Sequence, residues 1–301
     1  MSKKRKNDKI STEKDLAKLM EEVNKQNFTS IDELKDFMDN LMGQSLDNLP
    51  DRTDKKGRSQ DLVYQAYEQP ITKAKKLIKK ALELDPNNAE AYNYLAGIET
   101  DLDRIMALYE KAIIAGEKTL GKKFFKENKG YFWGLLETRP YMRAKAGLAE
   151  CLYVKNELDK AIEIYEEMLA LNPNDNQGIR YSLSTLLLEK NDLTKFEQFV
   201  KKHEDEYRSV WKFNNALYHF KKFGKNAMTN KVLLAAHKGN KYVIDYLLGI
   251  KKLPEEPPQY MGIGDENEAI TYVYGAWKVW VETDNALEWL YAFKLKRMKK
   301  N

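Results

Sequence analysis

The sequence predicts an all-α protein in which antiparallel helix pairs stack into an α-solenoid. Glycine and proline, the residues that interrupt helices, are sparse, with 15 Gly and 8 Pro in 301 residues. Hydrophobic residues make up 43% and charged residues 32% of the chain, so a core can be buried under a polar surface and a disordered chain is excluded. A two-helix pattern also recurs along the sequence, as in solenoids whose helix pairs stack only on their neighbours.

The first part of the chain is expected to hold a flexible basic tail (residues 1–10), then helices and a linker (residues 11–59). Residues 13–24 have the spacing of an amphipathic helix. In the next amphipathic stretch, Ser30 is followed three residues later by Glu33, which is the spacing of a capping box. We therefore expect one or two N-terminal capping helices.

The repeat array is expected over residues 60–250, and its best unit covers residues 144–173. In such a unit small residues let the two helices approach, large residues fill the gap, and a proline stops the second helix. The unit has a large–small pair, a small residue where the helices cross, an aromatic residue and a closing proline: Leu148, Ala149, Ala161, Tyr165 and Pro173.

Other units repeat this spacing. Residues 74–86 carry the second-helix pattern, and residues 92–112 carry a further helix pair. Residues 176–203 and 207–236 are weaker copies. The residues on which the clear copies depend are Ala74, Ile78, Ala81, Pro86, Tyr92, Leu95, Ala96, Ile105, Tyr109 and Ala112.

The unit at residues 144–173 resembles a tetratricopeptide repeat (TPR), a ~34-residue pair of antiparallel helices. Residues 116–143, 172–181 and 264–269 resemble an uncharacterised family of bacterial TPR proteins, and the resemblance extends over most of residues 30–290. It implies a fold and no activity. Similar co-chaperone repeats grip a C-terminal carboxylate with Lys and Asn at fixed first-helix positions. Those positions hold Ala146, Glu150 and Val154, so chaperone-tail capture is not expected.

An insertion at residues 116–143 interrupts the array and is rich in aromatic residues and arginine. In one interpretation it is a buried wedge, in which Arg139 and Arg143 hold Glu137 or nearby carbonyls. In the other it lines a concave groove, because aromatic residues and Arg are enriched at binding hot spots. The candidate partner-binding residues are Tyr131, Trp133, Arg139, Arg143 and Tyr181.

Residues 251–301 are expected to form a loop, C-terminal capping helices and a basic tail. Asp265 and Glu268 have the spacing of a second capping box. They are expected to begin a helix that runs to about residue 281, and a last helix should cover residues 285–300.

No pattern predicts catalysis, a cofactor site or a metal site, so the chain is not expected to be an enzyme. The glycines at 262 and 264 lack the Gly-Lys-Ser/Thr of a phosphate loop. Cys151 has no evident base beside it in the sequence. The three histidines stand 16 and 18 residues apart, without the spacing of a helical zinc-ligand pair: His203, His219 and His237.

The sequence therefore favours a protein–protein interaction scaffold that binds a protein or peptide on a concave surface. A regulator that senses a ligand or peptide is one alternative, and weak nucleic-acid binding through the basic tails is another. Residues 1–9 carry a net charge of +4 and residues 294–300 carry +5, so subtracting both tails from the net charge of +5 leaves −4 for the rest of the chain. Nucleic-acid binding is disfavoured, because proteins that bind nucleic acid usually carry their positive charge on a folded face.

The expected location is the cytoplasm, since one cysteine allows no internal disulfide. No apolar run approaches the ~18–20 residues that span a bilayer, so membrane insertion is not expected. Either a monomer or a dimer fits the sequence.

Overall fold

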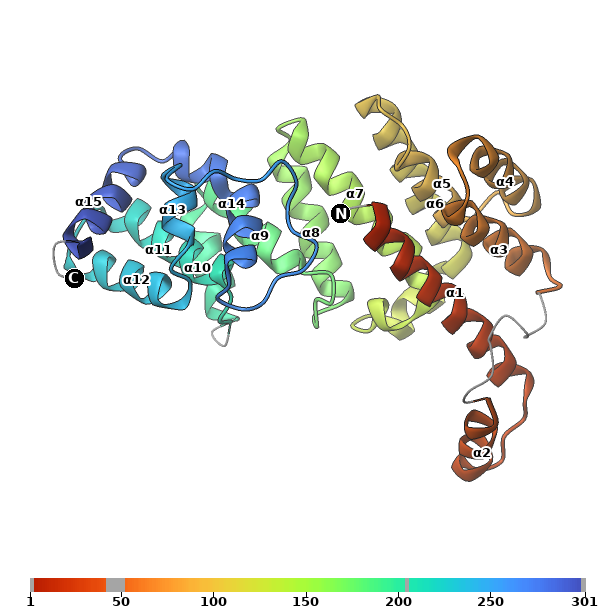
Figure 1. Cartoon of the computed structure of the whole chain (residues 1–301). Coiled ribbons are helices and arrows are strands. Elements are labelled where there is room, and N and C mark those ends of the chain that lie inside the picture. The colour runs from red at the N-terminus through yellow and green to blue at the C-terminus, as the bar shows by residue number, and fades with distance from the viewer. Residues whose placement is uncertain (1–2, 42–51, 204–205, 299–301) are drawn as a thin grey trace. The chain divides into compact units, whose positions relative to one another are not determined.

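The computed structural model describes residues 3–41, 52–203 and 206–298, and every regular element in these ranges is helical (Figure 1). The helices belong to two compact units. The first unit holds residues 1–157 and 170–176, and the second holds residues 158–169 and 177–301. The all-α prediction is confirmed. The domain boundaries expected from the sequence stay predictions.

The first unit is a series of packed helices in which α3 packs on α4, α5 on α6, and α6 on α7. Asp54, Asn88 and Asp101 cap the N-termini of α3, α5 and α6, each accepting a bond from the backbone N–H three residues on. The elements are α1 (Lys3–Lys25), α2 (Ile31–Leu41), α3 (Lys55–Glu68), α4 (Ile71–Leu84), α5 (Ala89–Ala96), α6 (Leu102–Asn128), the 3₁₀ turns η2 (Phe132–Gly134) and η3 (Leu136–Thr138), and α7 (Arg139–Val154).

Small residues lie where the repeat pattern requires them. Ala74, Ala81, Ala149 and Ala161 are completely buried. The backbone of α7 also comes close to the side chains of α6 at Gly147, where an added Cβ would lie 2.3 Å from Cζ of Tyr109. Close approach at small residues is the physical basis of the repeat spacing.

The predicted insertion at residues 116–143 consists of the end of α6, the turns η2 and η3, and the start of α7. The chain departs from helical geometry at Gly121, whose φ of 74° lies in the left-handed region that glycine tolerates. Phe132 is fully buried, with its ring 4.9 Å from that of Phe125. The aromatic run is therefore partly core.

The second unit packs α11 against α12 and α9, and packs α14 against α9 and α13. A buried polar chain crosses its centre: the Trp280 indole donates to the Tyr272 hydroxyl, and this hydroxyl donates to Asn214. The elements are α8 (Leu158–Leu171, through residue 169 in this unit), α9 (Ile179–Glu189), α10 (Leu193–Lys201), α11 (Ser209–Phe223), α12 (Ala227–Gly239), α13 (Val243–Leu247), α14 (Glu266–Val281) and α15 (Ala286–Met298).

Both predicted capping boxes have the N-cap bond. Glu33 donates its N–H to Ser30, while its carboxylate accepts from the N–H and hydroxyl of Thr29. Glu268 donates its N–H to Asp265 at 2.7 Å. Its buried carboxylate accepts instead from the Ser209 N–H and hydroxyl, from Asn240, and from the N–H of residue 264.

The N-terminal helix differs most from its expected bounds, because α1 begins at Lys3 and not near residue 13. Lysine and arginine are good helix formers, so a polar segment continues the helix inside the expected tail. Nothing in the described ranges is a helix long and apolar enough to cross a membrane.

Candidate functional site

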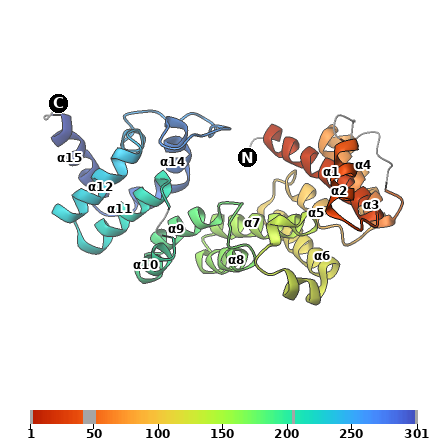
Figure 2. The ribbon, with the colours of Figure 1, turned by 90° about the horizontal axis from the view of Figure 1, so that it is seen from below.

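Helix α1 lies along α3 in the first unit (Figures 1 and 2). Its residue Ile10 is 3% exposed and belongs to the core cluster that includes Val63, Tyr64 and Tyr67 of α3. Three residues further on, Glu13 is also buried. Because positions three apart share a helix face, α1 turns one apolar and one acidic side chain to the same surface.

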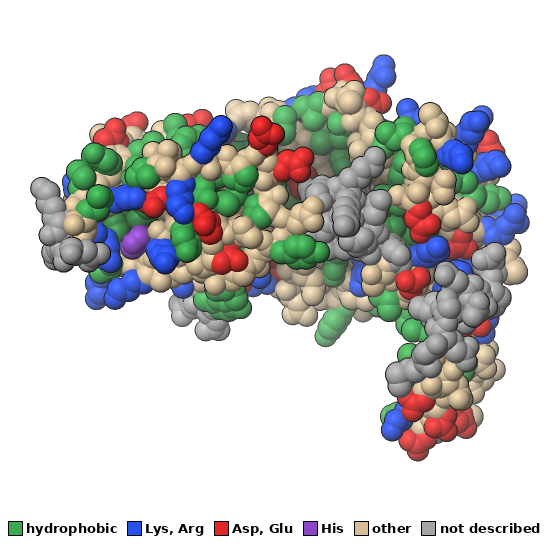
Figure 3. All heavy atoms as spheres, in the orientation of Figure 1, with side chains coloured by type: hydrophobic (Ala, Val, Ile, Leu, Met, Phe, Trp, Pro, Cys, Tyr) green, Lys and Arg blue, Asp and Glu red, His purple; other side chains and the backbone are tan. Residues whose placement is uncertain are grey.

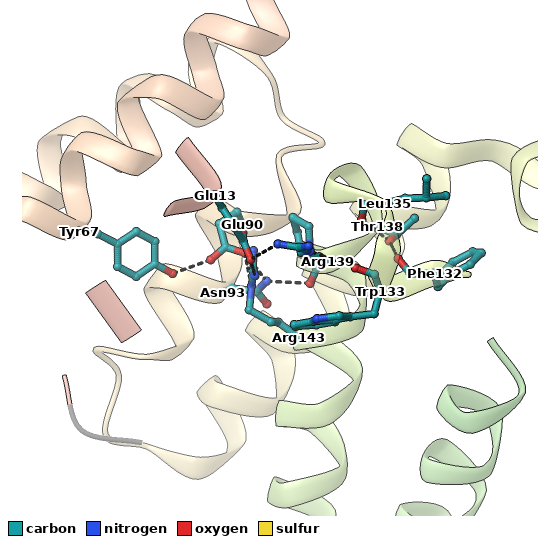
Figure 4. Close-up of polar contacts among 11 residues, drawn as sticks. Glu13, Tyr67, Glu90, Asn93, Phe132, Trp133, Leu135, Thr138, Arg139 and Arg143 are labelled. Carbon is teal, nitrogen blue, oxygen red and sulfur yellow. Dashed lines mark hydrogen bonds and ion pairs between the residues drawn. The ribbon is translucent and has the colours of Figure 1, made fainter. Parts of the chain in front are cut away.

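Arg143 of α7 lies between two carboxylates from distant parts of the sequence (Figure 4). Its Nη1 donates to both carboxylate oxygens of Glu13, at 2.8 and 3.0 Å. Its Nε and Nη2 donate to Oε2 of Glu90, at 3.0 and 2.9 Å. Such charge-assisted bonds are the stronger hydrogen bonds of proteins, and here they join α1, α5 and α7.

Glu90 has no exposed surface, and neutral donors complete its environment. The Tyr67 hydroxyl donates to its Oε1 at 2.6 Å, and the Asn93 amide donates to its Oε2 at 3.0 Å. Burial, together with the negative charge of Glu90, raises the pKa of the Tyr67 hydroxyl well above its ordinary value. The hydroxyl therefore stays protonated and continues to donate.

Burial alone would lower the pKa of the Arg143 guanidinium, but Glu90 and Glu13 outweigh it, and the pKa is raised above its ordinary value. Arg143 is thus charged at every accessible pH. The side chain remains 20% exposed, against 9% for Glu13 and none for Glu90.

Arg139, one turn before Arg143, contacts both the turn η2 and helix α1. Its Nε donates to the Trp133 carbonyl at 3.1 Å, and its guanidinium carbon lies 5.5 Å from the centre of the Trp133 ring. Its Nη1 is 3.4 Å from Glu13. Arg139, Arg143, Glu13 and Glu90 thus form a cluster of two positive and two negative groups, which we call the charge cluster (Figure 4).

A hollow of about 620 Å³ opens beside this cluster, between α1, α3, the start of α5 and the turns before α7. Leu16 and Met20 of α1 line it and are 39% and 50% exposed. Glu13, Tyr64 and Arg139 also line it. The hollow therefore combines apolar surface with both signs of charge.

The predicted site residues lie in different surroundings. Trp133, Arg139 and Arg143 come together at the charge cluster. Tyr131, in contrast, is 70% exposed, and its backbone N–H and carbonyl make hydrogen bonds within the turn. Tyr181 belongs to the second unit, where its hydroxyl donates to Glu206 at 3.0 Å. Burial first, and then Glu206, raises the pKa of Tyr181 to about 12.

Both sequence interpretations of the arginines therefore retain support. Arg139 holds a carbonyl, that of Trp133, as the wedge interpretation expects, while Glu137 is exposed. Arg139 also lines the hollow, as the groove interpretation expects. That these residues bind a partner stays a prediction.

Sequence reasoning missed Glu13 and Glu90, the acidic half of the charge cluster. Glu13 is 130 residues from Arg143, and Glu90 is 53 residues from it. Nothing local distinguishes either glutamate from the many solvated ones in a chain that is 32% charged. The only available indication was that Glu13 follows Ile10 by three residues in an amphipathic segment.

The remaining reactive residues have ordinary structural surroundings. Cys151 is buried, and this burial, followed by the charge of Glu150, raises the pKa of its thiol. Burial lowers the pKa of both His219 and His237. Within the part of the chain that the structure describes, no three His, Cys, Asp or Glu side chains group as metal ligands would.

Comparison with known proteins identifies the repeats. Two family models, both described as tetratricopeptide repeat, match residues 77–113 and 132–176. These ranges include the predicted units at residues 92–112 and 144–173, and the weaker units further along the chain stay predictions. None of the curated proteins compared matches the chain. The chain is therefore a protein that contains tetratricopeptide repeats.

Proposed function

We propose that this chain is a non-enzymatic scaffold that binds a protein or peptide on the face of the first unit formed by α3, α5 and α7. Tetratricopeptide repeats generally mediate protein–protein interaction. The observation that carries the proposal is the hollow beside the charge cluster, where Arg139 lies on one continuous surface with Leu135 and Leu136 of the turns before α7. We place the protein in the cytoplasm, with the single buried Cys151 as support.

The face has the composition of a recognition surface. Arg139 is already held by the Trp133 carbonyl and ring, so its guanidinium needs little ordering when a partner binds. A preordered site loses less conformational entropy on association. Arginine and tryptophan are also the residue types that most often dominate binding energy. Mixed chemistry favours an amphipathic partner segment over a purely charged polymer.

The test compares capture of proteins from a lysate of the source organism by three full-length chains. These are the wild type, Arg139→Glu, and the control Lys123→Glu, which reverses a charge at an 87% exposed side chain of α6. Circular dichroism first establishes that all three are helical. We expect a protein that wild type and Lys123→Glu retain and Arg139→Glu loses. Identical capture by all three chains would refute the proposed face.

A further inference from the structure

We propose that α1 is an internal ligand of this face, and that the partner's binding element is an amphipathic helix that replaces α1 and presents a carboxylate to Arg139 and Arg143 at the position of Glu13. This inference rests on the proposed function and specifies the chemistry of the partner. It follows from how α1 is attached, from the charge it covers, and from what surrounds its attachment.

One stripe of side chains carries the central part of the attachment of α1. Ile10 enters the α3 core cluster, and Glu13 reaches both arginines. Ala17, four residues further on, lines the hollow. Positions i, i+3 and i+7 lie on one face of a helix. Beside this stripe, Lys14 pairs with Glu68 at 3.6 Å and Glu21 pairs with Arg52 at 3.2 Å. A foreign helix that carries these five side-chain types at the same spacing could reproduce the contacts.

The charge left behind when α1 departs determines which helix can follow. With Glu13 present, two guanidiniums face two carboxylates. Without it, Arg139 and Arg143 face Glu90 alone, and the face carries excess positive charge. A partly buried charge that loses its partner is strongly destabilised. An occupant that brings a carboxylate to the position of Glu13 restores the balance, whereas a helix without a carboxylate there does not.

The segment that follows α1 leaves it free to detach. None of the described residues 26–41 is buried, and α2 contributes no buried residue. Ile31 at the start of α2 is 84% exposed, and Figure 3 shows acidic side chains gathered on this helix. Apart from Ile10, the core cluster around α3 consists of residues 62–98. Release of α1 therefore removes one residue from that core and leaves the repeat helices in place.

The experiment measures binding of a fluorescent peptide, residues 3–25 of this chain, to the full-length protein by anisotropy. In wild type the tethered α1 competes with the peptide. In Glu13→Gln the tethered helix is weakened, so we expect the peptide to bind at least about tenfold tighter, which corresponds to ~1.4 kcal/mol. The control Glu22→Gln should behave as wild type, because Glu22 pairs with Lys25 inside α1.

Two further peptides test the chemistry of the occupant. The same peptide with Gln at position 13 should bind Glu13→Gln at least about tenfold more weakly than the unaltered peptide. A glutamine–alanine host helix that carries Ile, Glu, Lys, Ala and Glu at the spacing of positions 10, 13, 14, 17 and 21 should still bind. Loss of the charge dependence, or failure of the host helix, would overturn the assignment to a helix that presents a carboxylate.

A second preparation keeps the charge cluster intact in case the substitution disturbs folding. A protease site is inserted within residues 42–51 of the full chain, the chain is cut, and labelled peptide is added in excess. We expect one labelled peptide per chain to replace the cut α1, and no exchange would overturn the inference. Light scattering of uncut wild type should give the mass of a monomer. A dimer would overturn the inference, because the α1 helix on each face could then come from the second copy.

These results are separable from those of the lysate experiment. If peptide exchange fails while Arg139-dependent capture succeeds, the replacement of α1 by a partner helix is refuted and the proposed scaffold function stands. If exchange succeeds and no protein is captured, the proposed scaffold function is refuted and α1 is still a detachable helix.

Discussion

Replacing Gly147 with alanine sets two effects of opposite sign against each other. Alanine is favoured over glycine inside a helix by about 1 kcal/mol, so an unobstructed site would gain stability. At this site the new Cβ would lie 2.3 Å from Cζ of Tyr109 and 2.6 Å from both Cε atoms, whereas carbon atoms in contact prefer about 3.5–4.0 Å. The tyrosine ring would therefore have to retreat by roughly 1 Å.

Tyr109 has little room for that movement, because it packs on the alanine cluster between α5, α6 and α7. Overpacking of this kind costs about 1–3 kcal/mol and should outweigh the helix propensity. Because an approach of 2.3 Å belongs in the upper part of that range, about 2–3 kcal/mol, subtracting the gain of about 1 kcal/mol leaves an expected loss of about 1–2 kcal/mol in the free energy of unfolding of Gly147→Ala. Tyr109→Leu in the same chain should recover part of the loss, because the two residues are in contact.

The assay is urea unfolding followed by hydrogen exchange in peptides from α6 and α7, which isolates the first unit from the second. The control is Gly134→Ala, where an added Cβ meets nothing within 4 Å, and its stability should change by less than about 0.5 kcal/mol. Unchanged or increased protection of α6 and α7 in Gly147→Ala would refute the close approach of the two helices.

Two further predictions concern the second unit. Burial, and next the charge of Arg297, lowers the pKa of His237 below its ordinary value of 6.5. The stability that the neutral His237 imidazole contributes to the folded state is therefore complete above pH 6.5 and is lost as the pH falls through the folded-state pKa. His237→Gln should therefore lose less stability than wild type between pH 7 and pH 5 in urea titrations, and parallel losses would contradict this. Glu268→Gln should destabilise the second unit by about 3 kcal/mol in the same titration. The reason is that an amide replaces a buried carboxylate that accepts hydrogen bonds from three residues. A loss below about 1 kcal/mol would show that these bonds contribute little to stability.

The sequence predicts the repeat helices well because their determinants are local. The buried positions of Ala74, Ile78 and Ala81 follow from spacing within one helix. The helix from Glu266 to Val281 follows from its N-cap at Asp265 and from its apolar period. Spacing of three or four residues is set by helix geometry and does not depend on the rest of the fold.

The site could be predicted only in part, since its two halves come from distant segments. Arg139 and Arg143 stand out locally because they are four residues apart in an aromatic stretch. Their partner Glu13 lies in a different helix, and its contact depends on how α1 packs on α3. The hollow depends on the same packing. Short-range spacing contains no information on such a contact.

The position of Trp133 under the guanidinium of Arg139 gives the first unit an optical property of its own. The chain has five tryptophans, and the four others all belong to the second unit. A difference between the emission of wild type and of Trp133→Phe therefore isolates one indole, 5.5 Å from Arg139. Movement of this arginine would alter the field at that indole, so occupancy of the face could be followed without an attached dye.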